Sequence, residues 1–405
     1  MKDQNIVMLC QQNWDLGIGF NAKNMAKEFA KDNHVLFVNM PLDVNTVLKG
    51  FGRADVARHL RVLLGRAPGL VAAAPNLWVL TPGVVSLSIN WLASRPLFRR
   101  LNRWNARLLA ASIGRATQQL GFADFHLLQD GIIYQGLELA QQLRPAPRTS
   151  TYYLRDYMVS VPYFQRHGPW VEPLLIQQAD VVVANSAYLN DYALQHTPRS
   201  FDIGQGCVLA QYQADAAYPP PADLAAVPGP VFGYTGFLTG SRLDIDLLLS
   251  VARQRPRWSF VLVGPEDEDF RQSDLHTLPN VHFLGRKAPE ELAAYVQQFD
   301  VCINPQAINK ITVGNYPLKI DEYLAMGKPV VATATRTMEM FAGYVYLATG
   351  ATEWLSQLAT ALTDQDPARR RARVAFAHSH SWEASTRKLY DAVASVEQRN
   401  LVAQP

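Results

Sequence analysis

The sequence predicts an α/β protein of two successive domains, each built on a parallel sheet that helices cover on both faces. Short apolar runs rich in β-branched residues alternate with longer helical patterns along nearly the whole chain, which is typical of parallel sheets. The length of 405 residues suits two domains, and 48% hydrophobic with 18% charged residues excludes a disordered chain. The alternation lapses once, at residues 212–230.

The first domain is predicted from strands with an apolar interior, each followed by a helical pattern. The clearest of these strands are NIVMLC, HVLFV and DVVVA. Residues 69–94 carry no charge and are numerous enough to cross a bilayer, but their prolines and asparagines predict a buried strand between loops instead. Strands are expected at 5–10, 34–38, 77–81, 126–129, 150–153 and 180–184, and helices at 21–31, 91–119, 134–143 and 186–196.

A proline-rich segment is expected to separate the domains. Residues 212–230 hold a run of three prolines and two more, which predicts a semi-rigid linker. We therefore expect an amino-terminal domain over 1–215 and a carboxyl-terminal domain over 216–382. Two such domains imply a cleft between them, where ligands bind at the carboxyl ends of the strands. The second domain should have strands at 231–234, 259–263, 281–284, 301–304 and 329–332, with helices beginning near 244, 289 and 318.

The most informative segment is NYPLKIDEYLAMGKPVVA, residues 315–332. Pro317 is placed to open a helix, on which Lys319 and Glu322 share one face. The amino end of a helix offers unpaired N–H groups and a positive dipole end, which suit a diphosphate. Lys319 would add a cation there, and Glu322 could accept hydrogen bonds from a ribose diol. The competing interpretation is an ordinary surface ion pair.

This segment and those around it resemble the GT-B glycosyltransferases of the retaining type that build bacterial surface polysaccharides, the teichuronic acid glycosyltransferases in particular. The similar segments of the carboxyl half, in the order of the family, are VFGYTGFLTGSRLDIDLLLSVA, WSFVLVGP and NVHFLGRKAPEELAAYVQQFDVCINP. Before them, TYYLRDY and DVVVANSAYL resemble parts of the acceptor domain. The resemblance implies a GT-B fold, in which two Rossmann-like βαβ domains face each other across a cleft.

The resemblance also implies roles for individual residues. The first domain would bind the acceptor and the second a nucleotide sugar, with UDP as the expected nucleotide. Glu322 would hold the ribose hydroxyls, and Lys319 with Arg242 would neutralise the diphosphate beside the helix end at Leu318. Gly236 would let the backbone approach the donor.

Four further donor-binding residues follow from the same comparison. Arg286 and Leu284 would line the pocket for the base, and Lys310 and Thr312 would lie near the sugar. The resemblance also implies that a final helix, about 383–405, packs back on the amino-terminal domain.

The sequence departs from the family at two positions that matter for sugar binding. Many relatives carry a glutamate eight positions before the ribose-binding one, where this chain has Gly314, and an arginine where it has Phe237. These departures favour a first alternative, a catalytically weak or inactive GT-B scaffold that binds a nucleotide or a partner protein. A second alternative is a sugar-nucleotide epimerase on the same fold, which would need no acceptor.

Candidate catalytic groups come from the ends of strands in the first domain. Asp156 and Asp130 each follow a predicted strand, so either could orient or deprotonate an acceptor hydroxyl. The alternative for each is a loop carboxylate paired with Arg155 or with a helix end. Gly17 and Gly19 form a loop that would approach the sugar and the acceptor, or a plain strand-to-helix turn.

No metal or cofactor site is predicted. The strings at 244–246 and 267–269 match an Asp-x-Asp pattern, but Asp244 stands where a helix cap is expected and the second string lies in a loop. The nicotinamide pattern GxGxxG does not fit the first glycine loop, and GxSxG is absent. Three cysteines without a CxxC pair predict neither disulfides nor zinc, and indicate a reducing compartment.

Positive charge is concentrated in residues 51–121, which hold ten arginines and one acid, while the remainder of the chain is acidic. Trp91, Phe98 and Trp104 are interleaved with these arginines, which favours an anionic membrane surface as a partner. A solvated arginine-rich helix without a ligand is the alternative, and no nucleic-acid motif accompanies the charge. We therefore expect a cytoplasmic protein, either free or peripheral at the inner face of the cytoplasmic membrane. The resemblance to glycosyltransferases implies a glycan or lipid-linked acceptor.

Overall fold

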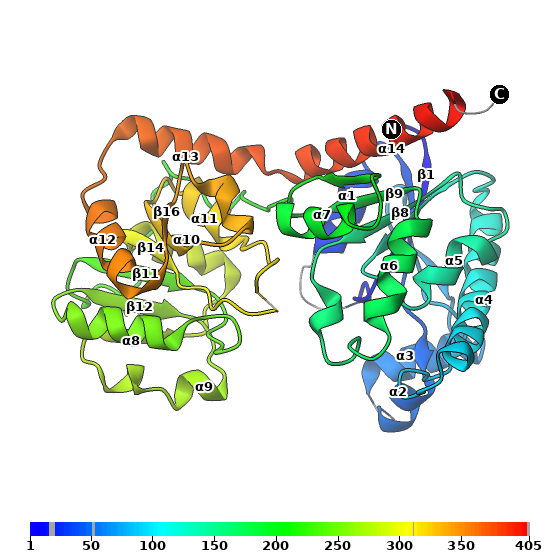
Figure 1. The fold of residues 1–405 in the computed structure, drawn as a ribbon, viewed down its shortest axis with the longest axis horizontal. Helices are drawn as coiled ribbons and strands as arrows, with labels where there is room; N and C mark the ends of the chain where they lie inside the picture. The colour runs from blue at the N-terminus through cyan, green and yellow to red at the C-terminus, as the bar shows by residue number, and fades with distance from the viewer. Residues whose placement is uncertain (16–20, 51–52, 311, 403–405) are drawn as a thin grey trace. The chain divides into compact units, whose positions relative to one another are not determined.

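The chain forms two compact units (Figure 1). The amino-terminal unit comprises Met1–Gly204 and Ser385–Pro405, and the carboxyl-terminal unit comprises Gln205–Ala384. The units therefore change at 205 and 385, where the sequence suggested 216 and 383. The structure, a computed structural model, describes residues 1–15, 21–50, 53–310 and 312–402.

The amino-terminal unit is built on an eight-stranded sheet in the order β10-β9-β8-β7-β1-β2-β5-β4. Every neighbouring pair is parallel except β4 with β5, which forms a hairpin at one edge. The strands β7, β8 and β9 are entirely buried, and β1 and β2 are buried except at their first residue, because both faces of the sheet are covered, as the apolar sequences predict. The strands are β1 Asn5–Cys10, β2 His34–Val38, β4 Leu70–Ala74, β5 Leu77–Leu80, β7 His126–Asp130, β8 Thr149–Leu154, β9 Val181–Ala184 and β10 Ser200–Asp202.

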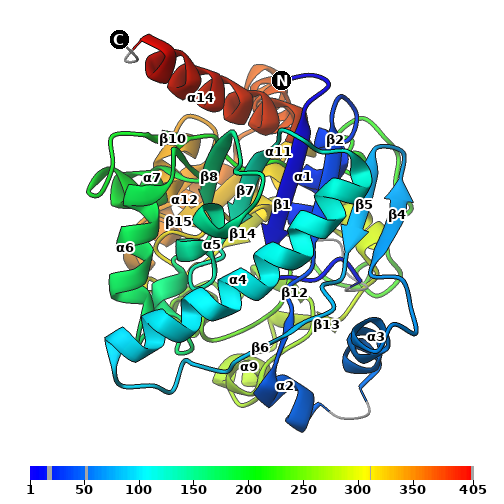
Figure 2. The same cartoon turned by 90° about the vertical axis from the view of Figure 1, so that its right-hand side faces the viewer.

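Helices cover both faces of this sheet, and α4 is the longest of those described, crossing the strands on one face (Figure 2). Leu109 and Ile113 of α4 pack against Val7 and Leu36 of β1 and β2. Ser94 caps α4 through its side chain, so the helix begins at Arg95 instead of the predicted 91. The helices are α1 Asn21–Phe29, α2 Val44–Lys49, α3 Ala54–Leu63, α4 Arg95–Leu120, α5 Gly136–Gln142, α6 Gly168–Gln178, α7 Ala187–Leu194 and α14 Trp382–Val402, which enters this unit at Ser385.

The uncharged stretch at 69–94 contains strands and loops, as predicted. It forms β4, β5 and the short β6 Val85–Ser86, which pairs in parallel with β3 Leu42–Asp43. Among the described helices, none combines the length and the apolar character needed to span a membrane.

The carboxyl-terminal unit has a six-stranded parallel sheet in the order β13-β12-β11-β14-β15-β16. In such an order the direction of winding reverses between β11 and β14, and ligands bind at the carboxyl ends of the strands at this point. The strands are β11 Val231–Thr235, β12 Ser259–Val263, β13 Val281–Gly285, β14 Val301–Asn304, β15 Val330–Thr333 and β16 Tyr346–Ala348. The α-helices are α8 Ile245–Gln254, α9 Glu268–Arg271, α10 Leu292–Gln298, α11 Lys319–Ala325, α12 Gly350–Leu362 and α13 Pro367–Ser379.

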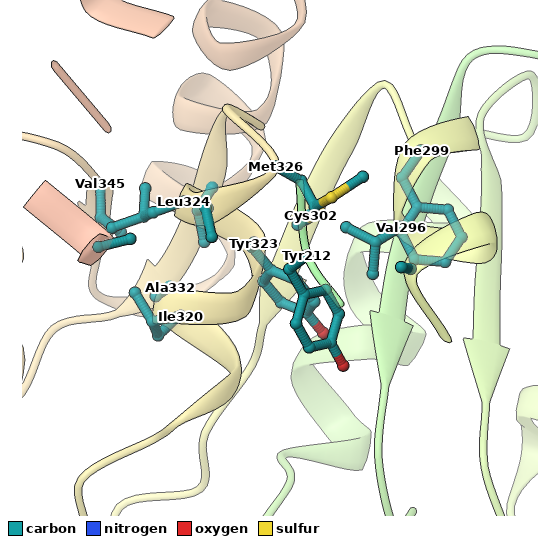
Figure 3. Close-up of a cluster of buried hydrophobic side chains, with 14 of the residues drawn as sticks. Tyr212, Val296, Phe299, Cys302, Ile320, Tyr323, Leu324, Met326, Ala332 and Val345 are labelled. Carbon is teal, nitrogen blue, oxygen red and sulfur yellow. The ribbon is translucent and has the colours of Figure 1, made fainter. Parts of the chain in front are cut away.

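One of the two cores of this unit includes the proline-rich segment (Figure 3). Tyr212 and Leu224 are buried in it with Val296, Ile320 and Tyr323. Residues 212–230 therefore belong to the carboxyl-terminal unit, and the predicted linker is wrong. The apolar side chains between the prolines give this segment surface to bury, which proline content alone does not reveal.

Candidate functional site

Two glycines allow the loops after β11 and β12 to meet at the carboxyl ends of these strands. Gly236 and Gly264 have φ of 140° and 156°, a region that other residues rarely adopt. A Cβ on Gly264 would stand 1.8 Å from the carbonyl oxygen of Gly236, and the Gly236 N–H donates to the Val263 carbonyl at 2.9 Å. Only glycine at 264 permits this backbone contact.

Lys319 lies beside Gly236. Its Nζ is 3.9 Å from the centroid of the Tyr234 ring and donates a hydrogen bond to the Tyr234 hydroxyl. A Cβ on Gly236 would come within 2.9 Å of this Nζ. Burial lowers the pKa of Lys319 to about 7, with Arg242 acting in the same direction and Glu322 in the opposite one. The Lys319 ammonium therefore titrates near neutral pH.

Glu322 lies one helical turn after Lys319 and is half-buried. Burial raises its pKa, while Lys319 and a hydrogen bond from the Tyr212 hydroxyl oppose the rise. Tyr212 comes from the segment that was predicted to be a linker, so the sequence pattern did not identify it as a partner. The pair at positions 319 and 322 is thus a partly desolvated cation and carboxyl group instead of a solvated surface pair.

The buried side of α11 is held by polar contacts. Asp321 is fully buried and accepts hydrogen bonds from Tyr316 at 2.8 Å and from the Cys207 thiol at 3.2 Å. Its other oxygen lies 2.7 Å from His380 Nδ1. On the strand side, the Thr235 N–H donates to the Tyr323 hydroxyl at 2.8 Å. The bond from Thr235 holds the helix at the end of β11, the contacts of Asp321 hold its other side, and none of them was predicted.

The other residues predicted to hold the diphosphate lie close by. Leu318 is the capping residue of α11, and its carbonyl accepts from the N–H groups of Asp321 and Glu322 at 3.1 and 3.3 Å. The helix therefore begins at Lys319, two residues later than Pro317 suggested. Arg242 is exposed after β11, and its guanidinium is close enough to influence the pKa of Lys319.

Two predicted sugar-side residues lie on the loop after β14. Thr312 is buried, and its hydroxyl accepts from the Asn309 N–H at 3.1 Å and donates to the Ala307 carbonyl. Its backbone carbonyl accepts from the Gln306 amide at 2.9 Å. The side chain of Thr312 thus holds its own loop together, whereas Lys310 is exposed.

The predicted base-binding residues lie on the edge strand of the sheet. Leu284 belongs to β13 and packs partly buried against the core, and Arg286 is exposed after the turn at Gly285, whose φ is 68°. In the sheet, β12 separates β13 from β11. A nucleotide that reached from Lys319 to Leu284 would therefore extend across the end of β12.

The two candidate catalytic aspartates differ sharply in exposure. Asp130, at the end of β7, is 2% exposed and pairs with Arg155 at 2.7 Å. Burial raises its pKa, and Arg155 opposes the rise. Asp156 follows β8 and is exposed. Gly17 and Gly19 of the predicted loop lie outside the described residues.

Part of the basic stretch is engaged within its own unit. Arg99 and Arg103 of α4 pair with the buried Glu138 at 3.3 and 3.0 Å. Phe98 is fully buried and stacks on His167 with the ring centroids 3.8 Å apart. Phe98 therefore cannot enter a membrane, which corrects one part of the prediction, whereas Trp91 and Trp104 are exposed.

The Asp-x-Asp strings are used as helix caps. Asp244 accepts from the Leu247 N–H at 2.8 Å at the start of α8, and Asp267 accepts from the Phe270 N–H at 3.1 Å at the start of α9. Within the described residues, no group of three or more His, Cys, Asp or Glu side chains is arranged to hold a metal ion.

Sequence comparison connects this site to known proteins. Residues 229–364 match the family described as glycosyl transferases group 1. Over 179 residues the chain is 31% identical to TuaH of Bacillus subtilis (strain 168), which is described as a teichuronic acid biosynthesis glycosyltransferase. The aligned stretch covers 42% of this chain and 45% of TuaH, so the match spans about half of that relative.

Solved structures share the fold over nearly the whole chain. Sucrose-phosphate synthase from Thermosynechococcus elongatus has a TM-score of 0.61 at 19% identity and covers 99% of this chain and 100% of that one. HepE of Anabaena in complex with UDP has a TM-score of 0.65 at 17% identity, and the match covers 98% of this chain and 100% of HepE. The UDP-forming trehalose-phosphate synthase of Burkholderia vietnamiensis has a TM-score of 0.61 at 15% identity, and the match covers 98% of this chain and 100% of the synthase. Together with the family match, they confirm the predicted GT-B fold and the resemblance.

Proposed function

We propose that this chain, a GT-B protein whose residues 229–364 belong to the group 1 glycosyl transferases, moves a sugar from a nucleoside-diphosphate sugar to a glycan or lipid-linked acceptor of bacterial surface polysaccharide synthesis. The observation that carries the proposal is the pair Lys319 and Glu322, one turn apart beside Gly236 at the end of β11. UDP is the proposed nucleotide, since HepE was solved with UDP.

In this proposal the carboxyl-terminal unit stabilises the leaving group. When the bond to the sugar breaks, negative charge develops on the nucleoside diphosphate, and a cation placed there in advance lowers the barrier. Lys319 and Arg242 would supply this charge without a metal ion, and Glu322 would hold the ribose hydroxyls. Gly236 would let the diphosphate approach the backbone. Retention of configuration at the anomeric carbon is part of the proposal and follows from the family.

The acceptor would be bound by the amino-terminal unit. Asp156 is the better candidate to orient or deprotonate an acceptor hydroxyl, because it is exposed at the end of β8. The buried Asp130 would instead position Arg155, with which it pairs. The surface of residues 51–121 would attach the protein peripherally to an anionic membrane.

Binding and turnover test the proposal together. UDP should bind in calorimetry, and Glu322→Ala should weaken binding roughly tenfold or more, because a charge-assisted hydrogen bond is lost. Asp274→Ala is the control, since it removes an exposed carboxylate that pairs with the exposed Arg253. Equal affinity of Glu322→Ala and the wild type would contradict the assigned site.

The second candidate, a scaffold that binds a nucleotide without transferring sugar, is favoured by Gly314 and by Phe237, which is exposed. A panel of UDP-sugars, offered with and without a saccharide acceptor, separates the candidates. Release of UDP that requires the acceptor supports the transferase. Binding without release supports the scaffold, and donor conversion without an acceptor identifies the epimerase.

A further inference from the structure

A pocket of about 610 Å³ in the amino-terminal unit has no part in the donor site. Its lining includes three cationic side chains, those of Lys49, Arg53 and Arg166, and two aromatic ones, those of Trp91 and Tyr163. Its volume falls within the range of pockets that hold small molecules. This combination of charge and aromatic surface indicates a specific class of ligand.

The frame of the pocket is fixed by hydrogen bonds between β3, α2 and the segment after β6. Figure 2 shows where α2 and β6 lie in this unit. Asp43 caps α2 by accepting from the Thr46 N–H at 3.1 Å and from the Thr46 hydroxyl at 2.7 Å. The Ser88 hydroxyl donates to the same carboxylate at 2.5 Å and accepts from the Asn45 N–H at 3.0 Å. The shape of the pocket is therefore set before a ligand arrives.

Cationic side chains outnumber acidic ones in the lining of the pocket. Asp43 is the one acidic residue of the lining, and its carboxylate already accepts three hydrogen bonds from within the frame. Within the described part of the chain, Lys49 and Arg166 form no ion pair with an acid, and both are exposed. The charges of Lys49 and Arg166 are thus available to an anion, and they outnumber the one carboxylate of the lining. Arg166 is held by a hydrogen bond to the Trp91 carbonyl.

The aromatic side chains are exposed although they are fixed. Trp91 is 68% exposed, and its indole N–H donates to the Ser88 carbonyl at 2.7 Å. Tyr163 is 53% exposed and packs edge-on against Phe164 with the centroids 5.0 Å apart. Large aromatic faces held open to solvent in a concave site are suited to stack against a flat, partly apolar ligand.

Asn90 adds hydrogen-bond donors to the pocket. The side-chain carbonyl of Asn90 accepts from the Tyr134 hydroxyl at 2.8 Å, so its amide N–H groups are the part left to donate to a ligand. A sugar ring offers both kinds of surface, because its C–H face packs on an aromatic ring while its hydroxyls accept hydrogen bonds from amides.

We propose that this pocket binds an anionic saccharide, a pyranose carrying a carboxylate or a phosphate, with the anion on Arg166 and Lys49 and the ring on Trp91. As the subsite for an acidic acceptor, it rests on the proposed transferase function. Carboxylate and phosphate share the geometry that an arginine binds through two hydrogen bonds.

Calorimetry with three probes tests the proposal: digalacturonate, the neutral disaccharide of the same linkage, and galactose 1-phosphate. At least one acidic probe should bind tenfold or more tightly than the neutral one, and Arg166→Gln and Trp91→Ala should each weaken it at least tenfold. Binding of digalacturonate identifies a uronic acid, and binding of galactose 1-phosphate alone identifies a phosphate ester.

Matched controls and a second readout keep the result interpretable. Arg100→Gln and Trp104→Ala change an exposed arginine and an exposed tryptophan of α4 that do not line the pocket, and both should bind like the wild type. Lys49→Gln should weaken binding as well. Absence of binding, equal affinity for the neutral disaccharide, or unchanged affinity of both pocket variants would overturn the proposal.

UDP affinity, measured on the same proteins, separates this failure from that of the proposed function. Arg166→Gln should bind UDP normally. If the protein binds an acidic saccharide but not UDP, the result supports the pocket and contradicts the proposed transferase function. If it binds UDP but no acidic saccharide, the result supports the donor site and contradicts the pocket.

Discussion

At the scale of single residues, the candidate donor site depends on a contact between two backbones. A methyl group on Gly264 would stand 1.8 Å from the Gly236 carbonyl oxygen, and no side chain can turn aside to relieve this overlap. Gly264→Ala should therefore destabilise the carboxyl-terminal unit by roughly 3 kcal/mol or more and abolish UDP binding, as measured by chemical denaturation and calorimetry.

Gly343→Ala provides the control for that substitution. An added Cβ at Gly343 would have no neighbour within 4 Å, and φ there lies outside the left-handed region. This variant should unfold and bind UDP like the wild type. A stable Gly264→Ala protein with normal UDP affinity would show that the loops can separate without loss.

Lys319 gives UDP binding a pH dependence. Because the pKa of the unliganded ammonium is about 7, raising the pH above 7 removes the charge that the diphosphate needs. UDP affinity should fall by up to about tenfold per pH unit between pH 7 and 9, where the phosphates of UDP no longer titrate. Calorimetry across this range measures the fall.

Two variants isolate the cause of this pH dependence. Lys319→Gln should bind UDP weakly and show no fall in affinity above pH 7, whereas Glu322→Gln should keep the fall. The raised pKa of Glu322 acts with the opposite sign, since deprotonation at higher pH improves its ability to accept hydrogen bonds from a ribose. A wild-type affinity that is constant from pH 7 to 9 would contradict the assignment of Lys319.

The residues that carry charge were predictable, but their partners were not. Lys319, Glu322 and Gly236 belong to sequence segments that occur in the same order as in the glycosyltransferase family, and the structure brings these three residues together. Tyr234 is 85 positions from the lysine that lies on its ring, and Tyr212 belongs to another segment again. Such pairs are set by the alignment of strands and helices in three dimensions, which local spacing does not contain.

At the scale of secondary structure, periodicity located the strands and helices better than it located their exposed faces. The arginine-rich helix was predicted, but its pattern cannot say which side packs on the sheet. Phe98 is on the buried side, and Arg99 and Arg103 are drawn to Glu138, a carboxylate of α5 that only the fold brings near. Fewer side chains are therefore available to a membrane than the sequence suggested.

Attachment to an anionic membrane should accordingly depend on the exposed arginines of α4 that pair with no acid among the described residues, such as Arg100 and Arg107. Each cation near the surface contributes about 1 kcal/mol, so replacing Arg100 and Arg107 together by glutamine should weaken binding roughly tenfold or more. Co-sedimentation with phosphatidylglycerol vesicles at low and high salt measures this effect.

The matched control for the membrane experiment removes the same charge from the other unit. Arg255 and Arg257 are exposed in the carboxyl-terminal unit, and their replacement by glutamine should leave vesicle binding unchanged. Binding that is indifferent to lipid charge, or equally reduced in both double variants, would refute the role of α4.

At the scale of the whole molecule, the proposal places all the positive charge for the diphosphate in protein side chains. UDP should therefore raise the melting temperature in the presence of EDTA as much as in its absence. At a hundredfold excess over the dissociation constant, binding adds about 2.7 kcal/mol to the stability of the protein, which a thermal scan detects.

Adding magnesium or manganese distinguishes a metal-dependent site from the metal-free site proposed here. A metal-dependent site would show a shift with UDP only when one of these ions is present, and EDTA would abolish it. The same scan with Lys319→Gln should show a reduced shift under all conditions.

The overall architecture followed from the sequence because parallel sheets leave a strong signal of apolar strands. The boundary between the units did not, since the prolines of 212–230 predict a linker, whereas Tyr212 and Leu224 supply buried surface there. A few apolar side chains between prolines are too weak a pattern to reveal which domain they join.

The position of Tyr212 has a practical consequence for anyone who exchanges this domain between enzymes. The family match begins at residue 229, and a chimaera joined there would inherit its 205–228 segment from the other parent. That graft would replace the tyrosine behind Glu322 and a portion of the core, so a change of donor preference could not be attributed to the transplanted part. Joining at residue 205 transfers Tyr212 and the core around it together with the rest of the carboxyl-terminal unit.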